Sequence, residues 1–252
     1  MYPELFSIGD ISVSSFSVMA LVSLLVGWIV ASSEVKRKGL NPNISDFLLI
    51  ACVIGGLGGA KVLFLFQNAS LSGFINDPVR YMASGFTFFG GIIGSLILVC
   101  LVSLYYKISF WQLTDCLSPA LILGQAFGRV GCLLVGDDYG IPSSLPWALS
   151  FPNGSPPTFE RVHPTQIYES IAMVISFIIV WKLRKRDYPI GWISGLTLII
   201  LGVVRFPLEI LRNTTPSFIP EMSQAQLISI ILIIIGVVKL LSLKKRQLAQ
   251  NI

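Results

Sequence analysis

The chain has 252 residues, of which 54% are hydrophobic and 12% charged, and its mean hydropathy is +0.77. A soluble domain is about one-quarter charged, so this chain has too few charged side chains to cover a water-facing surface. The net charge of +5 comes from short, separate basic clusters, which argues against a nucleic-acid-binding patch. We therefore expect an all-α, polytopic membrane protein that forms a single transmembrane bundle over residues 1–252.

Seven segments are apolar enough to span a membrane, since a spanning helix needs about 20 such residues. In chain order they cover residues 11–33, 47–66, 85–106, 108–134, 163–181, 190–211 and 224–243. The first ten residues contain no lysine or arginine, so we do not expect a cleaved signal peptide. The four cysteines lie apart in apolar stretches and are interpreted as core residues rather than disulfides or metal ligands.

The basic clusters predict the orientation of the spans, because lysine and arginine collect on the cytoplasmic side of membrane proteins. Twelve of the 18 basic residues fall on one side of the alternating spans, within residues 36–38, 107, 182–186 and 239–246. That side is predicted to be the cytoplasm, so the N-terminus lies outside and the C-terminus in the cytoplasm. The longest polar connection, residues 136–164, is then an extracytoplasmic loop.

Three spans carry pairs of glycines at a spacing of four residues, which is typical of close helix packing in lipid. The pairs are Gly55 with Gly59, Gly90 with Gly94, and Gly124 with Gly128. Asp115, near the start of the fourth span, is interpreted as a structural residue.

Charged side chains within the spans mark a candidate working site, since ionisable groups at membrane depth are costly and often functional. Arg205, Glu209 and Arg212 share one helical face of the sixth span, and Arg129 lies near the end of the fourth. Counted together, these residues have a surplus of positive charge, and guanidinium forks match phosphate oxygens. A phosphate-binding site is therefore predicted, and a purely structural ion-pair network is the alternative.

Two other residues each have two interpretations. His163 is the only histidine, and imidazole is the side-chain base that titrates near neutral pH, so it is either catalytic or structural. Lys61 is either a counter-charge for a lipid phosphate or a side chain that extends to the headgroups. No metal-ligand cluster or nucleotide-binding loop is visible in the sequence, so neither a metal nor a cofactor is expected.

Several motifs, in one order along the chain, resemble the prolipoprotein diacylglyceryl transferase family. They comprise residues 89–94, 128–140, 145–152 and 163–169, followed by Arg205, Glu209 and Arg212. The resemblance covers nearly the whole chain and implies an enzyme of the bacterial cytoplasmic (inner) membrane. Such an enzyme transfers the diacylglyceryl group of phosphatidylglycerol to the lipobox cysteine thiol of a preprolipoprotein and releases glycerol phosphate.

The resemblance also implies roles for particular residues. Arg129 and Arg205 would bind the lipid headgroup and stabilise the leaving phosphate, and Glu209 would hold Arg205. The thiol would be activated either by His163 or by the field of the arginines. The remaining residues of the predicted substrate-binding set are Lys61, Phe89, Asp137, Gly140 and Arg212.

Four positions depart from the family pattern. Phe89 stands where the family usually has histidine or tyrosine, and Phe16 where it has tyrosine. Cys132 stands where asparagine is common, and Asp137 where the signature has glutamate. Because phenylalanine can neither take a proton nor donate a hydrogen bond, one alternative is a divergent paralogue that transfers a lipid group to another acceptor. A second alternative, in which the charged residues of the spans form an anion path, is a membrane carrier for an anionic substrate.

Overall fold

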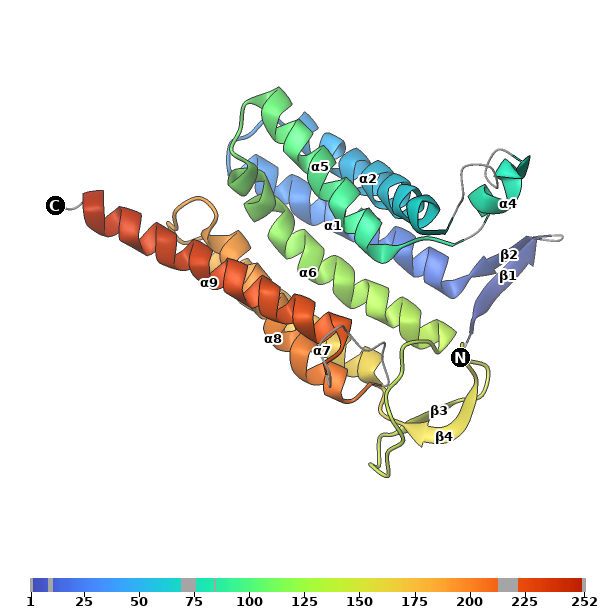
Figure 1. The fold of residues 1–252 in the computed structure, drawn as a ribbon. Coiled ribbons are helices and arrows are strands. Elements are labelled where there is room, and N and C mark those ends of the chain that lie inside the picture. Colours follow the sequence, from blue (N-terminus) through green and yellow to red (C-terminus); the bar gives the residue numbers. More distant parts are fainter. Residues whose placement is uncertain (1, 9–10, 69–75, 84, 213–221, 251–252) are drawn as a thin grey trace. The chain divides into compact units, whose positions relative to one another are not determined.

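The computed structural model describes residues 2–8, 11–68, 76–83, 85–212 and 222–250 (Figure 1). Within them, seven helices are long and apolar enough to cross a membrane, which confirms the predicted all-α polytopic class. These are α1 (Ser15–Arg37), α2 (Asn43–Asn68), α5 (Phe88–Tyr106), α6 (Phe110–Val135), α7 (Thr165–Leu183), α8 (Trp192–Ile210) and α9 (Gln224–Gln250). The smaller elements are helix α4 (Pro78–Ala83) and the strands β1 (Glu4–Ile8), β2 (Ile11–Ser14), β3 (Leu149–Phe151) and β4 (Thr158–Val162).

Two short hairpins modify the boundaries expected from the sequence. The predicted first span includes residues 11–14, but these residues form β2, which pairs antiparallel with β1 so that Ser7 lies opposite Ser12. Their alternation of apolar and polar residues has the period of a strand, and helix α1 starts only at Ser15. The second hairpin lies in the long loop, where β3 and β4 pair antiparallel.

The chain divides into two compact units. Unit 1 comprises residues 1–30 and 114–252, and unit 2 comprises residues 31–113. Unit 1 therefore contains most of α6, the long loop and helices α7 to α9, whereas unit 2 contains α2, α4 and α5.

Helices α2 and α5 of unit 2 pack antiparallel, with their backbones in direct contact. A methyl group added to Gly59 would overlap the carbonyl oxygen of Gly90, and one added to Gly94 would overlap that of Gly55. The predicted role of these two glycine pairs in close packing is thus confirmed. Gly124 and Gly128 of α6 differ, because the nearest atoms to an added methyl group, in Ser23, lie 3.6 and 4.0 Å away. Packing at that pair is of ordinary tightness.

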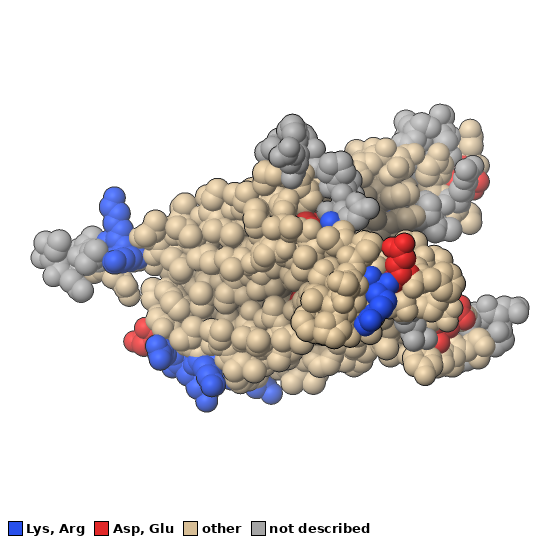
Figure 2. Space-filling view, turned by 90° about the horizontal axis from the view of Figure 1, so that it is seen from below, with Lys and Arg blue, Asp and Glu red and all other residues tan. Residues whose placement is uncertain are grey.

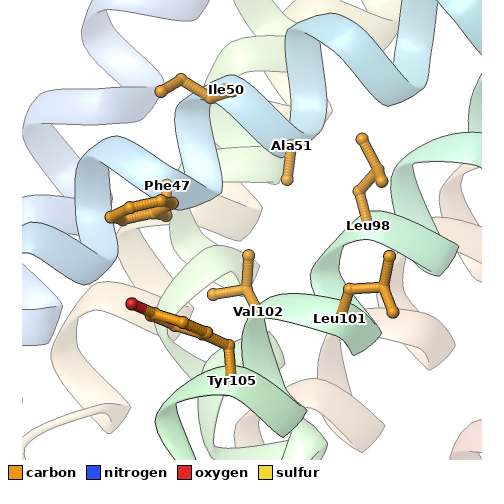
Figure 3. Close-up of a pocket in the computed structure, with 7 residues that line it drawn as sticks. All are labelled: Phe47, Ile50, Ala51, Leu98, Leu101, Val102 and Tyr105. Carbon is orange, nitrogen blue, oxygen red and sulfur yellow. The ribbon is translucent and has the colours of Figure 1, made fainter.

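The same two helices enclose a shallow apolar pocket of about 250 Å³ within unit 2 (Figure 3). Its lining consists of Phe47, Ile50, Ala51, Leu98, Leu101, Val102 and Tyr105. Because the only polar group in this lining is the Tyr105 hydroxyl, the pocket provides no positive charge for a phosphate.

Helices α6, α7 and α8 form the core of unit 1. The buried side chains of Ile122, Ala126, Met173, Val180 and Ile193 pack together there. The N-terminal segment is fixed to the end of α6, since the Tyr2 N–H donates to the Leu134 carbonyl at 3.1 Å. The N-terminus and the long loop therefore share one end of unit 1, and the C-terminus lies at the other (Figure 1).

Asp115 of α6 caps the beginning of α8. Its carboxylate accepts hydrogen bonds from the N–H groups of Gly191 and Ser194, each at 2.8 Å, and from the Ser194 hydroxyl at 2.6 Å. The first N–H groups of a helix have no partner within the helix, and a carboxylate at this end also interacts favourably with the helix dipole. The structural role expected for Asp115 therefore has a specific basis.

The outer surface fits a lipid environment. On the face drawn in Figure 2, uncharged side chains cover most of the surface, and charged residues occupy a few small groups. Large apolar side chains such as Leu57, Leu121 and Val203 are more than half exposed within the spanning helices. Such exposure is unfavourable in water and normal in a bilayer, because lipid tails are as apolar as these side chains.

The backbone contact between α2 and α5 leads to a prediction about stability. Gly59→Ala places a methyl group against the Gly90 carbonyl and should destabilise the protein by about 1–3 kcal/mol, because neither backbone can move aside easily. The neighbouring Gly58 has no atom within 4 Å of an added methyl group, so Gly58→Ala is the matched control. Thermal unfolding in detergent should show a lower Tm for Gly59→Ala alone, and equal Tm values for the two variants would contradict the contact.

Candidate functional site

Six charged side chains of unit 1 form one connected ion-pair network. Helix α6 contributes Arg129, α7 contributes Glu169, and α8 contributes Arg205 and Glu209. The other two members are Asp138, in the loop after α6, and Arg212, just beyond the end of α8. The structure thus brings together the four charged residues that the sequence analysis grouped, and it adds Glu169 and Asp138.

Glu169 is the centre of this network, and its side chain is only 2% exposed. Its Oε2 atom lies 3.0 Å from Nε of Arg129 and accepts a hydrogen bond from Nη1 of Arg205 at 2.8 Å. Its Oε1 atom accepts a hydrogen bond from Nε2 of Gln125 at 2.8 Å. Because Gln125 lies one helical turn before Arg129, α6 contacts both carboxylate oxygens of Glu169. The two arginines are therefore fixed relative to each other by a single buried carboxylate.

The outer part of the network is formed by Asp138. Its Oδ2 atom accepts a hydrogen bond from Nη1 of Arg129 at 2.7 Å, and its Oδ1 atom pairs with Nη2 of Arg212. Glu209 pairs with Arg205, with 3.1 Å between Oε2 and Nη2. The structure thus pairs Glu209 with Arg205, and it pairs Arg212 with the loop.

These contacts correct the net positive charge from which a phosphate-binding site was predicted. Counting only the four residues grouped from the sequence gave a positive surplus. The network contains three guanidinium groups and three carboxylates, so its formal charge is zero. An added anion must either bring the network to a negative charge or replace one of its carboxylates. The three guanidinium groups remain the features that can bind a phosphate.

The first turn of α7 holds the main chain of the loop beside the network. The hydroxyl of Thr165 donates to the carbonyl of Asp138 at 2.8 Å, and the side-chain amide of Gln166 donates to the carbonyl of Asp137. Gly140 lies so close to the first residue of α7 and to the residue after α8 that an added methyl carbon would be 3.0 Å from Cγ2 of Thr165 and 2.5 Å from the carbonyl oxygen of Leu211. The requirement for glycine at position 140 is therefore one of space, and Gly140 positions the loop.

The two adjacent aspartates differ in their electrostatic environment. Burial alone would raise the pKa of Asp138, but the guanidinium groups of Arg212 and Arg129 outweigh it and hold that pKa below its usual range. For Asp137, burial dominates and raises the pKa. Asp138 is therefore firmly ionised at neutral pH. The ligand atoms of Cys132, Asp137 and Asp138 lie within 4.8 Å of one another, but both oxygens of Asp138 already face arginines, so this group is poorly arranged for a cation.

His163 lies in a second polar group at the start of α7. Its Nδ1 atom is 3.3 Å from the hydroxyl of Tyr168, and that hydroxyl accepts a hydrogen bond from Nε1 of Trp147 at 2.7 Å. If Nδ1 also donates to the Tyr168 oxygen, the lone pair of Nε2 is available to accept a proton. The carbonyl of His163 accepts the N–H of Gly140 at 2.8 Å, which places this histidine directly beside the loop of the network.

Lys61 and Phe89 belong to unit 2. Nζ of Lys61 donates to the carbonyl oxygens of Tyr81 and Gly85, at 3.2 and 3.1 Å, and lies 4.6 Å from the centre of the Phe86 ring. Lys61 thus provides hydrogen bonds to carbonyl groups at and just beyond the C-terminal end of α4. Phe89 is in the first turn of α5 and is 38% exposed. A substrate-binding role for either residue stays a prediction.

Phe16, at the start of α1, packs against α6 in unit 1. An added methyl carbon on Gly131 would lie 3.3 Å from Cδ2 of Phe16. The next residue, Cys132, is buried, and its sulfur is 3.8 Å from Nη1 of Arg129. Of the four positions that depart from the family pattern, Cys132 and Asp137 therefore lie beside residues of the network, and Phe16 contacts the neighbouring turn of α6.

Three residues of this site have roles that the sequence alone does not indicate. Glu169 was visible as a charge in an apolar span, but its partners lie 40 and 36 residues away in the chain. Gln125 carried the weaker signal of a polar side chain one turn from Arg129. Asp138 cannot be distinguished from its neighbour Asp137 in the sequence, because only the folded loop shows which of the two faces the arginines.

Known proteins resemble this chain along nearly its full length. The model of the prolipoprotein diacylglyceryl transferase family matches residues 3–242. A phosphatidylglycerol–prolipoprotein diacylglyceryl transferase of Clostridium tetani is 34% identical over 245 residues, which cover 94% of this chain and 96% of the relative. The enzyme of the same name from Finegoldia magna is 29% identical over 243 residues, covering 96% and 95%. That of Methylococcus capsulatus is 34% identical over 221 residues, covering 83% and 81%. The chain belongs to the prolipoprotein diacylglyceryl transferase family.

Proposed function

We propose that this protein transfers the diacylglyceryl group of phosphatidylglycerol to the lipobox cysteine of a preprolipoprotein in the bacterial inner membrane. The cysteine sulfur forms a bond to the terminal glycerol carbon of the diacylglyceryl group. The bond between that carbon and the phosphate oxygen breaks, and its electron pair leaves with glycerol phosphate. The thiol proton passes to a base. Family membership supports the donor and the acceptor, since the relatives carry both in their names.

The observation that carries this proposal is the set of three guanidinium groups at one end of the spans in unit 1. An arginine within a bilayer needs a reason to be there, and here Arg129, Arg205 and Arg212 are each mostly buried. Their planar forks can bind the phosphate of the lipid, and they can stabilise the charge that develops on it as the carbon–oxygen bond breaks. We assign headgroup binding and leaving-group stabilisation to Arg129 and Arg205, with Arg212, Asp137 and Gly140 at the loop side.

The proposed orientation places this network toward the outside of the cytoplasmic membrane. The basic clusters after α7 and in α9 lie toward the opposite end of unit 1 from the long loop (Figure 1). Since such clusters favour the cytoplasm, the loop and the arginines face outward. A precursor protein that has crossed the membrane would then meet the lipid headgroup on the correct side.

The arginine assignment predicts the outcome of a direct assay. Membranes containing the protein, supplied with phosphatidylglycerol and a lipobox peptide, should release glycerol phosphate and yield a lipid-modified peptide. Arg129→Ala or Arg205→Ala should lower the rate by about 100-fold or more, because each removes a donor aimed at the developing phosphate charge.

Arg161→Ala is the control, since that side chain donates to the carbonyl oxygens of Pro146 and Ala148 in the loop. It should reduce the rate much less than either network variant. Full activity of Arg129→Ala and Arg205→Ala would remove the assigned roles. Release of glycerol phosphate without modification of the peptide would point to a different acceptor.

We assign His163 as the base that takes the thiol proton, and Tyr168 as the residue that orients it. His163→Gln should slow transfer by about 100-fold at neutral pH, a typical size for general-base catalysis. The loss should shrink toward pH 9, because a peptide thiol with a pKa of about 8.5 then ionises without help. Tyr168→Phe should show a smaller loss. A His163→Gln defect that is equal at pH 7 and pH 9 would exclude the base role and leave activation by the arginines.

The central position of Glu169 gives a further expectation. Glu169→Gln leaves Arg129 and Arg205 without their shared charge partner, and breaking a buried ion pair in this way costs about 3–5 kcal/mol. Thermal unfolding in detergent should show a clearly lower Tm, and activity should fall with it. Glu160→Gln, which neutralises an exposed carboxylate of β4, should leave the Tm within a degree or two of the unmodified protein. A wild-type Tm for Glu169→Gln would show that the network does not depend on this charge.

A further inference from the structure

Asp138 differs from the other two carboxylates of the network in its exposure and its location. Its side chain is 46% exposed, whereas those of Glu169 and Glu209 are 2% exposed. The two glutamates project from spanning helices, and Asp138 projects from the loop. It is therefore the one carboxylate of these three that can leave the network without exposing a charge to lipid.

The contacts of Asp138 are those that a phosphate would make. One oxygen accepts a hydrogen bond from Arg129 and the other pairs with Arg212, so that a single anion bridges two guanidinium groups. A lipid phosphodiester also presents two unesterified oxygens that share one negative charge. Since guanidinium forks bind carboxylate and phosphate oxygens with similar geometry, the two anions compete for the same donors.

The backbone at Asp138 allows its side chain to leave while the loop stays in place. The Asp138 carbonyl is held by the Thr165 hydroxyl at 2.8 Å, and the residue has a φ of 59°. This left-handed conformation is one that aspartate, asparagine and glycine adopt more readily than other residues. Rotation about the side-chain bonds is therefore enough to move the carboxylate from the arginines into water.

We propose that Asp138 is an internal competitor that occupies the phosphate position of the lipid donor until phosphatidylglycerol displaces it. This inference rests on the proposed function. The exchange replaces one negative charge by another, so the network stays neutral when an anionic lipid binds. Asp138 thereby sets the affinity for the donor lipid, because the apparent affinity equals the intrinsic affinity multiplied by the fraction of time for which the position is free.

The direction in which the KM for phosphatidylglycerol changes tests whether Asp138 competes with the lipid. Asp138→Asn and Asp138→Gly remove the competing charge, and both residues tolerate the left-handed backbone. In mixed micelles of phosphatidylglycerol and phosphatidylcholine, both variants should have a KM for phosphatidylglycerol lower by about three- to tenfold, as expected if Asp138 occupies the position roughly 70–90% of the time. The change should be in KM rather than in a higher kcat. Phosphatidylglycerol should also raise the Tm of the variants at lower lipid fractions than it does for the unmodified protein.

A structural role for Asp138 predicts the opposite sign. Loss of its contacts would leave Arg129 and Arg212 poorly placed, and KM would rise while the lipid-free Tm fell. An unchanged or higher KM in both variants would overturn the inference. Glu160→Gln is the matched control, because it removes a negative charge from the same loop and should leave KM within twofold.

The same experiments separate this inference from the proposed function. If the unmodified protein neither releases glycerol phosphate nor gains thermal stability from phosphatidylglycerol, the proposed function itself fails. If it does both, and the Asp138 variants show no gain in affinity, only the inference about Asp138 is wrong.

Discussion

The structure of unit 1 depends on the bridge that Glu169 makes between Arg129 and Arg205. Three helices meet at this carboxylate, which pairs with one arginine of α6 and one arginine of α8. A charge that leaves water must regain its lost interactions within the protein, and here it does so through short contacts to opposite charges and to Gln125. The cost of keeping arginines in a bilayer is thus met by a carboxylate that also fixes their direction.

This requirement shapes what surrounds the bridge. The loop after α6 must fold back so that Asp138 reaches two arginines, and it can do so because Gly140 leaves room for α7. The carboxylates of Glu169 and Glu209 are buried, whereas the carboxylate of Asp138 is about half exposed to solvent. A site built in this way keeps its donors aligned while its outermost anion is exchangeable. Such preorganisation is what transition-state stabilisation by fixed charges needs.

The number of spans, their approximate limits and the family could be predicted from the sequence, because each rests on local patterns. The arginines of the site were also visible as charges in apolar segments. The ion pairs that these arginines make with Glu169 could not be predicted, because Glu169 is distant from both partners in the chain and helix periodicity relates only residues on one helix. The strand at residues 11–14 was missed because its apolar content merged with the following span. The equal numbers of positive and negative groups followed only from the fold, which brings Glu169 of α7 and Asp138 of the loop to the arginines.

The cap that Asp115 forms on α8 has a consequence for the far end of that helix. Asp115 and Arg129 lie 14 residues apart on α6, and Ser194 and Arg205 lie 11 residues apart on α8. At a rise of about 1.5 Å per residue, the two helices are joined at two levels separated by roughly 16–21 Å. Neither helix can slide along its axis or rotate about it without breaking either the Asp115–Ser194 hydrogen bonds or the ion pairs through Glu169. Inserting or deleting one residue in α8 between Ser194 and Arg205 would therefore rotate the guanidinium by about 100° away from its partners, although every side chain of the site would still be present.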